Sequence, residues 1–271
     1  CYEVSMSTLT EADIEARTHA VIDEVGLDAV DVDFRSALWD AGLAFVQYPE
    51  GKGGLGTAPA LQVAVEHAIR AAGRNFHPLG VNVIGIGMGL PTVLTYGSEK
   101  HHAKHLKRIF TGEDIWCQMF SEPDAGSDLA NAGMRAERDG DEWILNGSKV
   151  WTSRGTYARW GMCLARTDVS LAKHRGLTMF AVDMTAPGVE IRPLEQINGD
   201  RHFTEVFVSD VRVADADRIG DLGMGGRNGK AHQNGSDGDF RCHHFKFIFR
   251  QCCFINCKSL CHHDSCTLQW F

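Results

Sequence analysis

The segment Phe120-Ser121-Glu122-Pro123-Asp124-Ala125-Gly126-Ser127-Asp128 stands where the chain changes from helical to strand-like periodicity. Residues 115–121 read as a strand, and Pro123 and Gly126 then predict a tight turn. Such a turn presents the Ser127 hydroxyl and neighbouring backbone N–H groups as a nest for an anion. Any tight loop contains proline, glycine and hydroxyl residues, so a purely structural turn is the alternative.

Helical spacing of apolar residues dominates the chain before this segment. Thr8-Leu9-Thr10-Glu11 predicts a capping box that starts a helix ending at Gly26. Four glycines within residues 49–56 predict a loop. We expect further helices over residues 34–45, 61–72, 79–96 and 99–110, the last with its His and Lys side chains on the solvent face.

Strand periodicity dominates after the segment. Asp139-Gly140 predicts a hairpin over residues 135–145, and further strands are expected over 149–153, 160–166, 177–182, 189–193 and 204–208. Short strands at this spacing indicate a small β-barrel or sandwich, and helices followed by strands argue against a Rossmann domain. The predicted class is α+β, with an N-terminal helical domain over 1–111, a middle β domain over 112–220 and an irregular, disordered tail over 221–271.

The tail differs in composition from the rest of the chain. Six of the nine cysteines and five of the thirteen histidines follow residue 225, and Cys253, Cys257 and Cys261 recur every four residues. This spacing suits zinc ligands, but structural zinc sites usually hold two ligand pairs separated by a loop. We favour a C-terminus that arose from a shifted reading frame or a mis-joined exon. The tail is therefore assigned no metal ligand and is left out of the fold prediction.

Composition narrows the class of protein. Among 271 residues, 44% are hydrophobic and 23% are charged, the balance of a globular protein with a real core. No apolar run approaches the length of a membrane span, and a net charge of -8 argues against a nucleic-acid partner. No secretory signal is visible at the start, and the first residue is Cys1 rather than Met, which suggests a fragment.

A second informative stretch is Asn146-Gly147-Ser148-Lys149-Val150-Trp151-Thr152-Ser153. Strand alternation places Trp151 and Ser153 on one face, where the ring can stack against a flat group that the hydroxyl hydrogen-bonds. Composition alone favours the alternative, a Trp packed in the core of the sheet.

These two stretches make the chain resemble the acyl-CoA dehydrogenase family over residues 8–224. The resembling residues also include Tyr96-Gly97-Ser98-Glu99, Leu164-Ala165-Arg166-Thr167-Asp168 and Asp210-Val211-Arg212-Val213. The run Gln196-Ile197-Asn198-Gly199-Asp200 is more similar to bacterial branches, so the resemblance implies a bacterial cytoplasm, with the mitochondrial matrix as the alternative. The family adds a C-terminal four-helix bundle, and the pattern is lost near Gly225, so we expect that bundle to be missing.

The resemblance implies FAD as cofactor and an acyl-CoA thioester as substrate. It further implies α,β-dehydrogenation with hydride transfer to flavin N5, an electron-transfer flavoprotein or similar acceptor, and a homo- or hetero-oligomer. Carried over to this chain, the cofactor-binding residues are Gln118, Phe120, Ser121, Gly126, Ser127, Trp151, Thr152 and Ser153, and the substrate-binding residues are Ser127 and His174.

Individual roles follow from the same resemblance. Ser121 is expected to hydrogen-bond the pyrimidine edge of the isoalloxazine, Trp151 to pack beside the ring, and Ser153 to point at N5. Ser127 is expected to meet the pyrophosphate and lie next to the substrate's pantetheine. Gln118 stands where an aromatic residue is usual, and Arg154 replaces a small or amide residue, so both positions depart from the family pattern.

The catalytic base is the missing part of this assignment. In the family the base is a glutamate of the C-terminal bundle. Neither Glu122 nor Glu205 is assigned as the base here. Glu122 is expected to brace the flavin loop instead. The catalytic residue is therefore unknown, and the chain is expected to be truncated and impaired. The alternatives are a non-catalytic flavin- and acyl-CoA-binding subunit that completes a site with a partner chain, and a metal-binding regulator built on the tail.

Overall fold

The structure, a computed structural model, describes residues 9–80, 82–171 and 173–223. The chain divides into two units, residues 1–225 and 226–271, and the described residues all belong to the first. The predicted disordered tail and its Cys and His residues, apart from residues 221–223, lie outside the described residues.

The first helix, α1 (Glu11–Val25), begins two residues later than the capping prediction. Its N-cap is Thr10, whose hydroxyl accepts from the Asp13 N–H while the Asp13 carboxylate accepts from the Thr10 N–H at 2.8 Å. The predicted box starting at Thr8 is therefore wrong by two positions, because Thr10 and Asp13 form the same pattern one half-turn on. The helix ends at Gly26, as predicted, with φ of 82°.

The next helices are shorter than their apolar periods suggested. Helix α2 (Asp31–Asp40) ends before Phe45, so the predicted extension to that residue is wrong. The loop over 49–56 is confirmed, and a 3₁₀ turn, η1 (Pro59–Leu61), leads into α3 (Gln62–Ala71).

Two further helical stretches carry wide π-turns. In the first, η2 (Gly85–Gly89) runs into α4 (Leu90–Tyr96); in the second, α5 (Glu99–His101), η3 (His102–Leu106) and α6 (Lys107–Thr111) follow without a break. The second stretch does not keep all its histidines in solvent, since His101 and His105 are buried. That part of the prediction is wrong because His105 faces Trp116 and Trp160 rather than water.

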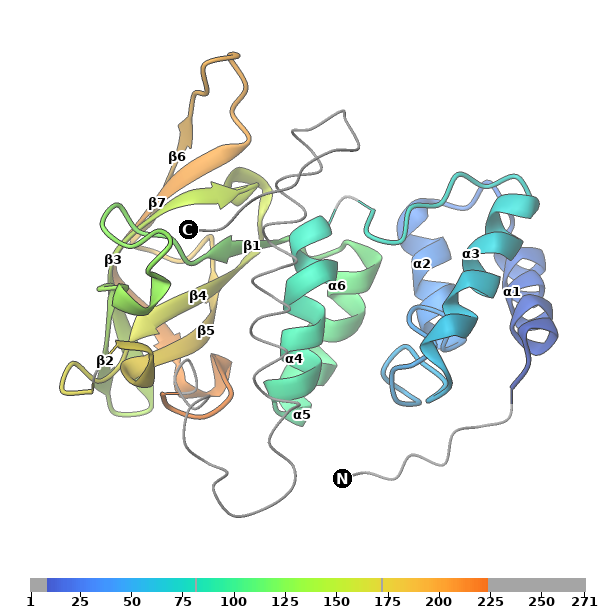
Figure 1. Cartoon of the computed structure of the whole chain (residues 1–271), viewed down its shortest axis with the longest axis horizontal. Helices are drawn as coiled ribbons and strands as arrows, with labels where there is room; N and C mark the ends of the chain where they lie inside the picture. The colour runs from blue at the N-terminus through green and yellow to red at the C-terminus, as the bar shows by residue number, and fades with distance from the viewer. Residues whose placement is uncertain (1–8, 81, 172, 224–271) are drawn as a thin grey trace, which may run out of the picture. The chain divides into compact units, whose positions relative to one another are not determined.

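One eight-stranded sheet forms the strand-rich half. Its strands are β1 (Trp116–Met119), β2 (Arg135–Asp139), β3 (Glu142–Ser153), β4 (Trp160–Arg166), β5 (Leu177–Asp183), β6 (Val189–Leu194), β7 (Phe203–Ala214) and β8 (Arg218–Ile219). The order is β6-β7-β3-β2-β4-β5-β8, with β1 parallel to β4 (Figure 1). Short 3₁₀ turns, η4 (Leu129–Asn131), η5 (Gly155–Tyr157), η6 (Lys173–Gly176) and η7 (Asp215–Asp217), connect them.

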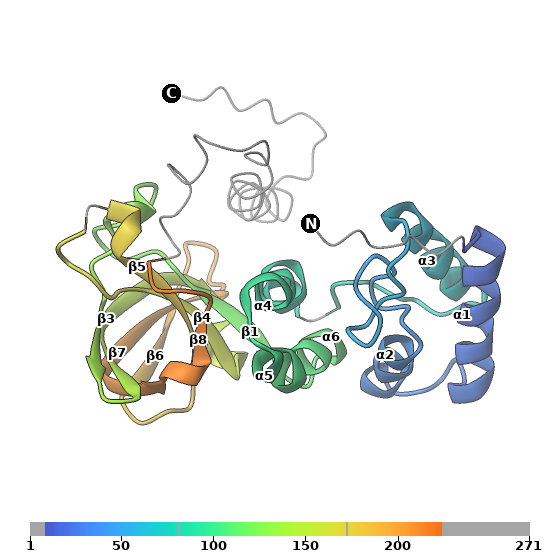
Figure 2. The same ribbon diagram turned by 90° about the horizontal axis from the view of Figure 1, so that it is seen from below.

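The α+β class and the helix-then-strand order are confirmed, but the sheet is open. The strands curve around a common core in Figure 2, but no described hydrogen bonds join β6 to β8, so the predicted barrel or sandwich takes the form of an open, curved sheet. The hairpin around Asp139-Gly140 is confirmed by the β2–β3 pairing, and the predicted strand over 149–153 is the second half of β3.

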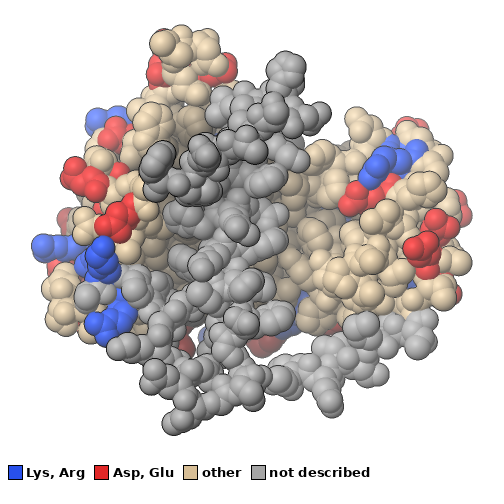
Figure 3. Space-filling model, viewed as in Figure 1, with Lys and Arg blue, Asp and Glu red and all other residues tan. Residues whose placement is uncertain are grey.

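The interior of the sheet is apolar and includes both described cysteines. Burial raises the pKa of the Cys163 thiol to about 11 and that of the Cys117 thiol further, so neither is a thiolate at neutral pH. Acidic and basic side chains are interspersed on the face drawn in Figure 3. Along the described parts of the chain, every helix is too short or too polar to cross a bilayer.

Candidate functional site

The turn that follows β1 is closed by its own backbone. Glu122 N donates to Ala125 O at 3.0 Å, and Ala125 N donates to Glu122 O at 3.1 Å. Beyond this closure Gly126 and Ser127 are exposed, and a Cβ at Gly126 would have open space within 4 Å. The turn therefore leaves a hydroxyl and a small backbone position free to receive a ligand.

The two segments singled out in the sequence lie side by side. Val150 N donates to Ser121 O at 2.8 Å, which joins the start of the turn to the second half of β3. Ser121 is half-buried at this contact. Ser121 and the end of β3 are thus parts of one site.

A bulge turns Trp151 outward at the end of β3. Lys149 pairs with Val206 and Thr152 with Thr204, so Val150 and Trp151 together face the single residue Glu205. Trp151 has φ of 59°, a rare conformation for a bulky residue, and the residue is 60% exposed. The composition-based expectation of a core Trp is therefore wrong, because the bulge breaks simple alternation.

Ser153 shares the outward face with this indole. Ser153 pairs with Phe203, whose ring meets Trp151 edge to face at a centroid distance of 5.8 Å. Directly paired residues project to the same side of a sheet. Trp151, Phe203 and Ser153 therefore form an aromatic surface with a hydroxyl beside it.

Three of the predicted residues lie beneath this surface or beside it. Thr152 is fully buried, and among the described residues its Oγ1 has no hydrogen-bond partner. The side chain of Phe120 is buried, so only its backbone can take part directly. Gln118 is half-buried on β1.

A buried ion pair lies under the turn. Lys149, which is fully buried, pairs with Glu122 at 2.7 Å from Nζ to Oε1. The Glu122 carboxylate also accepts from Gly133 N at 2.6 Å and Met134 N at 3.0 Å. Glu122 is therefore occupied as a brace, in keeping with its predicted role. Lys149 belongs to a stretch quoted for the resemblance, but no role was predicted for it from the sequence.

Arg166, at the end of β4, organises the neighbouring loops. Its guanidinium donates to Ala132 O at 3.0 Å, Ala130 O at 2.9 Å and Lys173 O at 2.8 Å. The segment after the turn is thereby held against η6, where exposed Lys173 lies 3.5 Å from Asp128. The side chain of His174 is not among those described. Arg166 was quoted for the resemblance, but nothing in the sequence indicated these contacts.

Taken together, the site offers an exposed aromatic face, hydroxyls beside it and a turn open to an anion. This set suits a flat conjugated ring with a polar edge and an attached phosphate. No group of three or more His, Cys, Asp or Glu side chains within 9–80, 82–171 and 173–223 is placed to hold a metal ion.

Comparison with known families agrees with this geometry. Residues 6–113 match the family described as acyl-CoA dehydrogenase, N-terminal domain, and residues 117–211 match the acyl-CoA dehydrogenase middle domain. The chain belongs to the acyl-CoA dehydrogenase family.

Particular relatives come from mycobacteria. The chain is 44% identical over 191 residues to acyl-CoA dehydrogenase FadE34 of Mycobacterium tuberculosis, covering 70% of this chain and 26% of that protein. It is 41% identical over 181 residues to acyl-CoA dehydrogenase IpdE1 of the same species, covering 66% of this chain and 46% of that protein. The chain thus spans less than half the length of these two relatives.

Solved structures share the fold. The ChsE4-ChsE5 complex from Mycobacterium tuberculosis aligns with a TM-score of 0.58 and 28% identity, covering 79% of this chain and 56% of that chain. A glutaryl-CoA dehydrogenase from Mycobacterium smegmatis in complex with FADH2 aligns with a TM-score of 0.52 and 25% identity, covering 78% of this chain and 55% of that chain.

Proposed function

We propose that this chain supplies the flavin- and acyl-CoA-binding surface of an FAD-dependent acyl-CoA dehydrogenase that carries out α,β-dehydrogenation. The observation that carries the proposal is the 2.8 Å hydrogen bond from Val150 N to Ser121 O, which brings both recognised segments to one place beside an exposed Trp151. We also propose the division into domains at residues 111 and 112, supported by family matches that end at 113 and resume at 117.

The residues present fit FAD. In this proposal the hydroxyl of half-buried Ser121 bonds the polar edge of the ring, and Trp151 offers its exposed face. The open position at Gly126 allows the backbone a close approach to a pyrophosphate, with exposed Ser127 beside it. The buried, unpartnered Thr152 Oγ1 and the half-buried Gln118 and Ser153 complete the proposed set, with the Phe120 contribution confined to its backbone.

The proposed reaction removes two hydrogens from the acyl group. When bound, FAD supplies a hydride acceptor at N5. The α-proton passes to a base, the β-hydrogen leaves as hydride, and a double bond forms between the two carbons. This chain's residues orient the site: Trp151 excludes water from one face, and the turn over 122–127 fixes the phosphates.

No described carboxylate is assigned as the base. Glu122 accepts two backbone N–H groups and the Lys149 ammonium, so its oxygens are already engaged. Glu205 lies on β7 opposite Arg192. His174 is the residue that we propose as a further contact for the substrate.

Titration of FAD into the full chain, followed by flavin fluorescence, tests the proposal. We expect saturable quenching for the wild type and about tenfold weaker binding for Ser121→Ala, since one hydrogen bond is worth roughly 1.4 kcal/mol. Ser148→Ala, a change at a half-buried serine of the neighbouring strand β3, is the matched control and should bind like the wild type. A wild-type chain that leaves flavin fluorescence unchanged would overturn the proposal.

A second candidate is a non-catalytic subunit that binds flavin and acyl-CoA and completes its site with a partner chain. The observation that favours it is the likeness to structures of hetero-complexes, ChsE4-ChsE5 and the Tcur3481-Tcur3483 steroid acyl-CoA dehydrogenase. Dye-coupled oxidation of acyl-CoA by the isolated chain supports the first candidate. Turnover that appears only after a partner chain is added supports the second, and in either case an electron-transfer flavoprotein is the proposed acceptor.

A further inference from the structure

The ammonium of Lys149 is buried completely and fully hydrogen-bonded. Its Nζ donates to Phe120 O at 3.1 Å, to Leu164 O at 2.7 Å and to Glu122 Oε1 at 2.7 Å. A lysine ammonium has three N–H donors, so each is used once. Two of the three acceptors belong to the residues immediately before and after Ser121.

The next residue of β3 holds Ser121 itself. Val150 N donates to Ser121 O at 2.8 Å. Three consecutive residues of the turn segment, 120, 121 and 122, are therefore each fixed by residue 149 or 150. This fixes the backbone on both sides of the hydroxyl that Ser121 presents.

The Glu122 carboxylate extends the same network away from β3. Its Oε2 accepts from Gly133 N at 2.6 Å and its Oε1 from Met134 N at 3.0 Å. Through this one ion pair the start of the turn, the segment entering β2 and the carbonyl of Leu164 on β4 are held together.

A role in stability alone explains this arrangement poorly. Burying a lysine and a glutamate costs desolvation, and apolar side chains of similar size commonly stabilise a core as well or better. Two of the three acceptors of Lys149 lie on the segment that carries the proposed flavin contacts.

We infer that Lys149 is a positioning residue, whose ammonium fixes the backbone on either side of Ser121 so that its hydroxyl meets the polar edge of the flavin. The inference rests on the proposed function. Lys149 itself acts through Phe120, Glu122 and Leu164, the three residues it binds.

The test compares Lys149→Met with Leu145→Ala in the full chain. Leu145 is a fully buried apolar residue of the same strand, so its truncation lowers stability without touching the ion pair. With both apoproteins folded, we expect Lys149→Met to weaken FAD binding at least tenfold and to alter the bound flavin's absorption bands. Leu145→Ala should stay within threefold of the wild type. Equal weakening by both variants, or affinity within threefold for Lys149→Met, would overturn the inference.

Amide hydrogen exchange without FAD separates this inference from the proposed function. Lys149→Met should speed exchange at least tenfold at Val150, Gly133 and Met134, whose N–H groups are held by Ser121 and Glu122. Amides of β5 should exchange as in the wild type. Unchanged exchange at the three amides sinks the positioning role even if FAD binds. Faster exchange in Lys149→Met than in the wild type, together with no FAD binding by the wild type, would overturn the proposed function but leave the role of Lys149 in holding the turn supported.

Discussion

His105 is buried among aromatic rings, and neither of its ring nitrogens has a hydrogen-bond partner within the described chain. Its ring meets Trp116 at 5.1 Å and Trp160 at 4.9 Å between centroids, both nearly perpendicular. Loss of hydration, aided by the charge of Lys104, lowers the pKa of His105 to about 4 from 6.5. A neutral imidazole is therefore the form that fits the folded protein.

This depressed pKa predicts acid sensitivity. The folded state binds the proton less readily than the unfolded state, so stability is full above pH 6.5 and falls as the pH drops toward 4. We expect wild-type protein to lose about 2 kcal/mol more than His105→Phe between pH 7 and pH 5. Urea unfolding at the two pH values measures the difference.

A histidine on the surface supplies the control for that experiment. His67 is 73% exposed beside Glu15, so His67→Gln should keep the wild-type pH dependence. An equal pH dependence in wild type and His105→Phe would show that the buried ring does not titrate in this range.

At this scale the sequence revealed residue types better than their orientations. Ser121 and Trp151 could be selected because hydroxyls and an aromatic flank a turn and end a strand. That Trp151 faces solvent could not be predicted, since it depends on the bulge against Glu205. The inward turn of Lys149 depends on partners 15 to 29 residues away in sequence.

The β3–β7 pair shows how single residues shape an element. Its first irregularity lies where Leu145 pairs with Val211 and Gly147 with Val208, so Asn146 faces two residues of β7. Two hydrogen bonds close this bulge: Asn146 Nδ2 donates to Asp210 Oδ1 at 3.0 Å, and Asp210 N donates to Asn146 Oδ1 at 2.9 Å. The bend places the second half of β3 beside the turn at Ser121.

Gly147 is the residue on which this bend depends. Its φ is 150°, and a Cβ there would approach the Met134 backbone and side chain at 2.9 to 3.0 Å. We expect Gly147→Ala to lower the free energy of unfolding by roughly 2 to 3 kcal/mol, from strain and overpacking together. Gly140→Ala, in the β2–β3 turn with φ of 62° and no atom within 4 Å, should cost only about 1 kcal/mol.

Chemical denaturation of the two variants ranks these costs. Equal losses would mean that backbone conformation alone matters and that Met134 yields freely. The start of the first helix was predicted two residues early for a different reason. Thr8-x-x-Glu11 and Thr10-x-x-Asp13 both satisfy the capping pattern, and only the folded helix shows which of them is used.

Across the whole molecule, local periodicity decided the order of helices and strands, whereas closure of the sheet required pairing between its outermost strands. The strand periods predicted β1 to β7 but not the two-residue β8, and they carry no information on hydrogen bonds between β6 and β8; the described sheet remains open. Hydrogen bonds between segments far apart in the chain could not be predicted from the sequence either, because their acceptors are backbone carbonyls, which every residue possesses.

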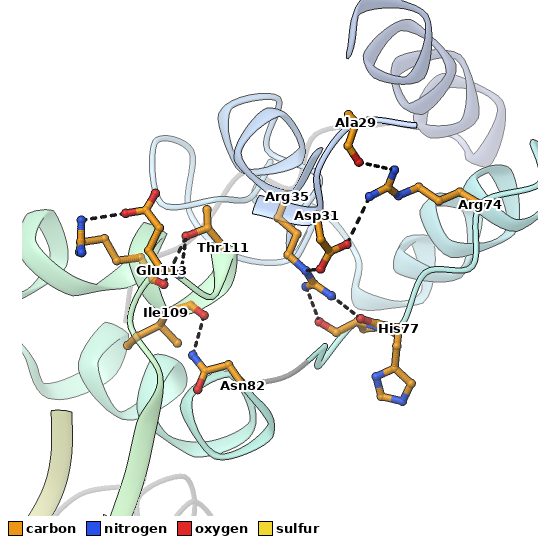
Figure 4. Close-up of polar contacts among 11 residues, drawn as sticks. Ala29, Asp31, Arg35, Arg74, His77, Asn82, Ile109, Thr111 and Glu113 are labelled. Carbon is orange, nitrogen blue, oxygen red and sulfur yellow. Dashed lines mark hydrogen bonds and ion pairs between the residues drawn. The ribbon is translucent and has the colours of Figure 1, made fainter. Parts of the chain in front are cut away.

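Arg35 makes the clearest of these connections (Figure 4). It is 3% exposed, and its guanidinium donates to Asp31 at 2.8 Å, Pro78 O at 3.0 Å and His77 O at 2.5 Å. It also lies over the rings of Phe76 at 4.9 Å and Phe110 at 5.5 Å, the latter on α6. One side chain thereby joins α2, the segment after α3, and α6.

Asn82 carries the connection onward to the sheet. Its amide donates to Ile109 O at 2.8 Å and to Asp114 O at 2.9 Å, while its Oδ1 accepts from Trp116 N at 3.0 Å. The end of α6 and the start of β1 therefore share one buried amide. Contacts of Arg35 with α6 and of Asn82 with α6 and β1 therefore form a continuous path from α2 to the strand that leads into the Ser121 turn.

Removing the guanidinium should weaken this coupling. We expect Arg35→Met to lower the free energy of unfolding by about 3 kcal/mol, because the partly buried carbonyls of His77 and Pro78 lose their donor and Met replaces only the apolar volume. Thermolysin should then cut native protein within residues 76–80 faster than in the wild type. Arg70→Met, which breaks an exposed pair with Glu66, should change stability by less than about 0.5 kcal/mol and leave cleavage unaltered. Only the guanidinium of Arg35 reaches the carbonyls of His77 and Pro78, so loss of these two bonds should affect Arg35→Met alone. Cleavage that is faster in both variants, or in neither, would contradict a specific role of Arg35 in holding this segment.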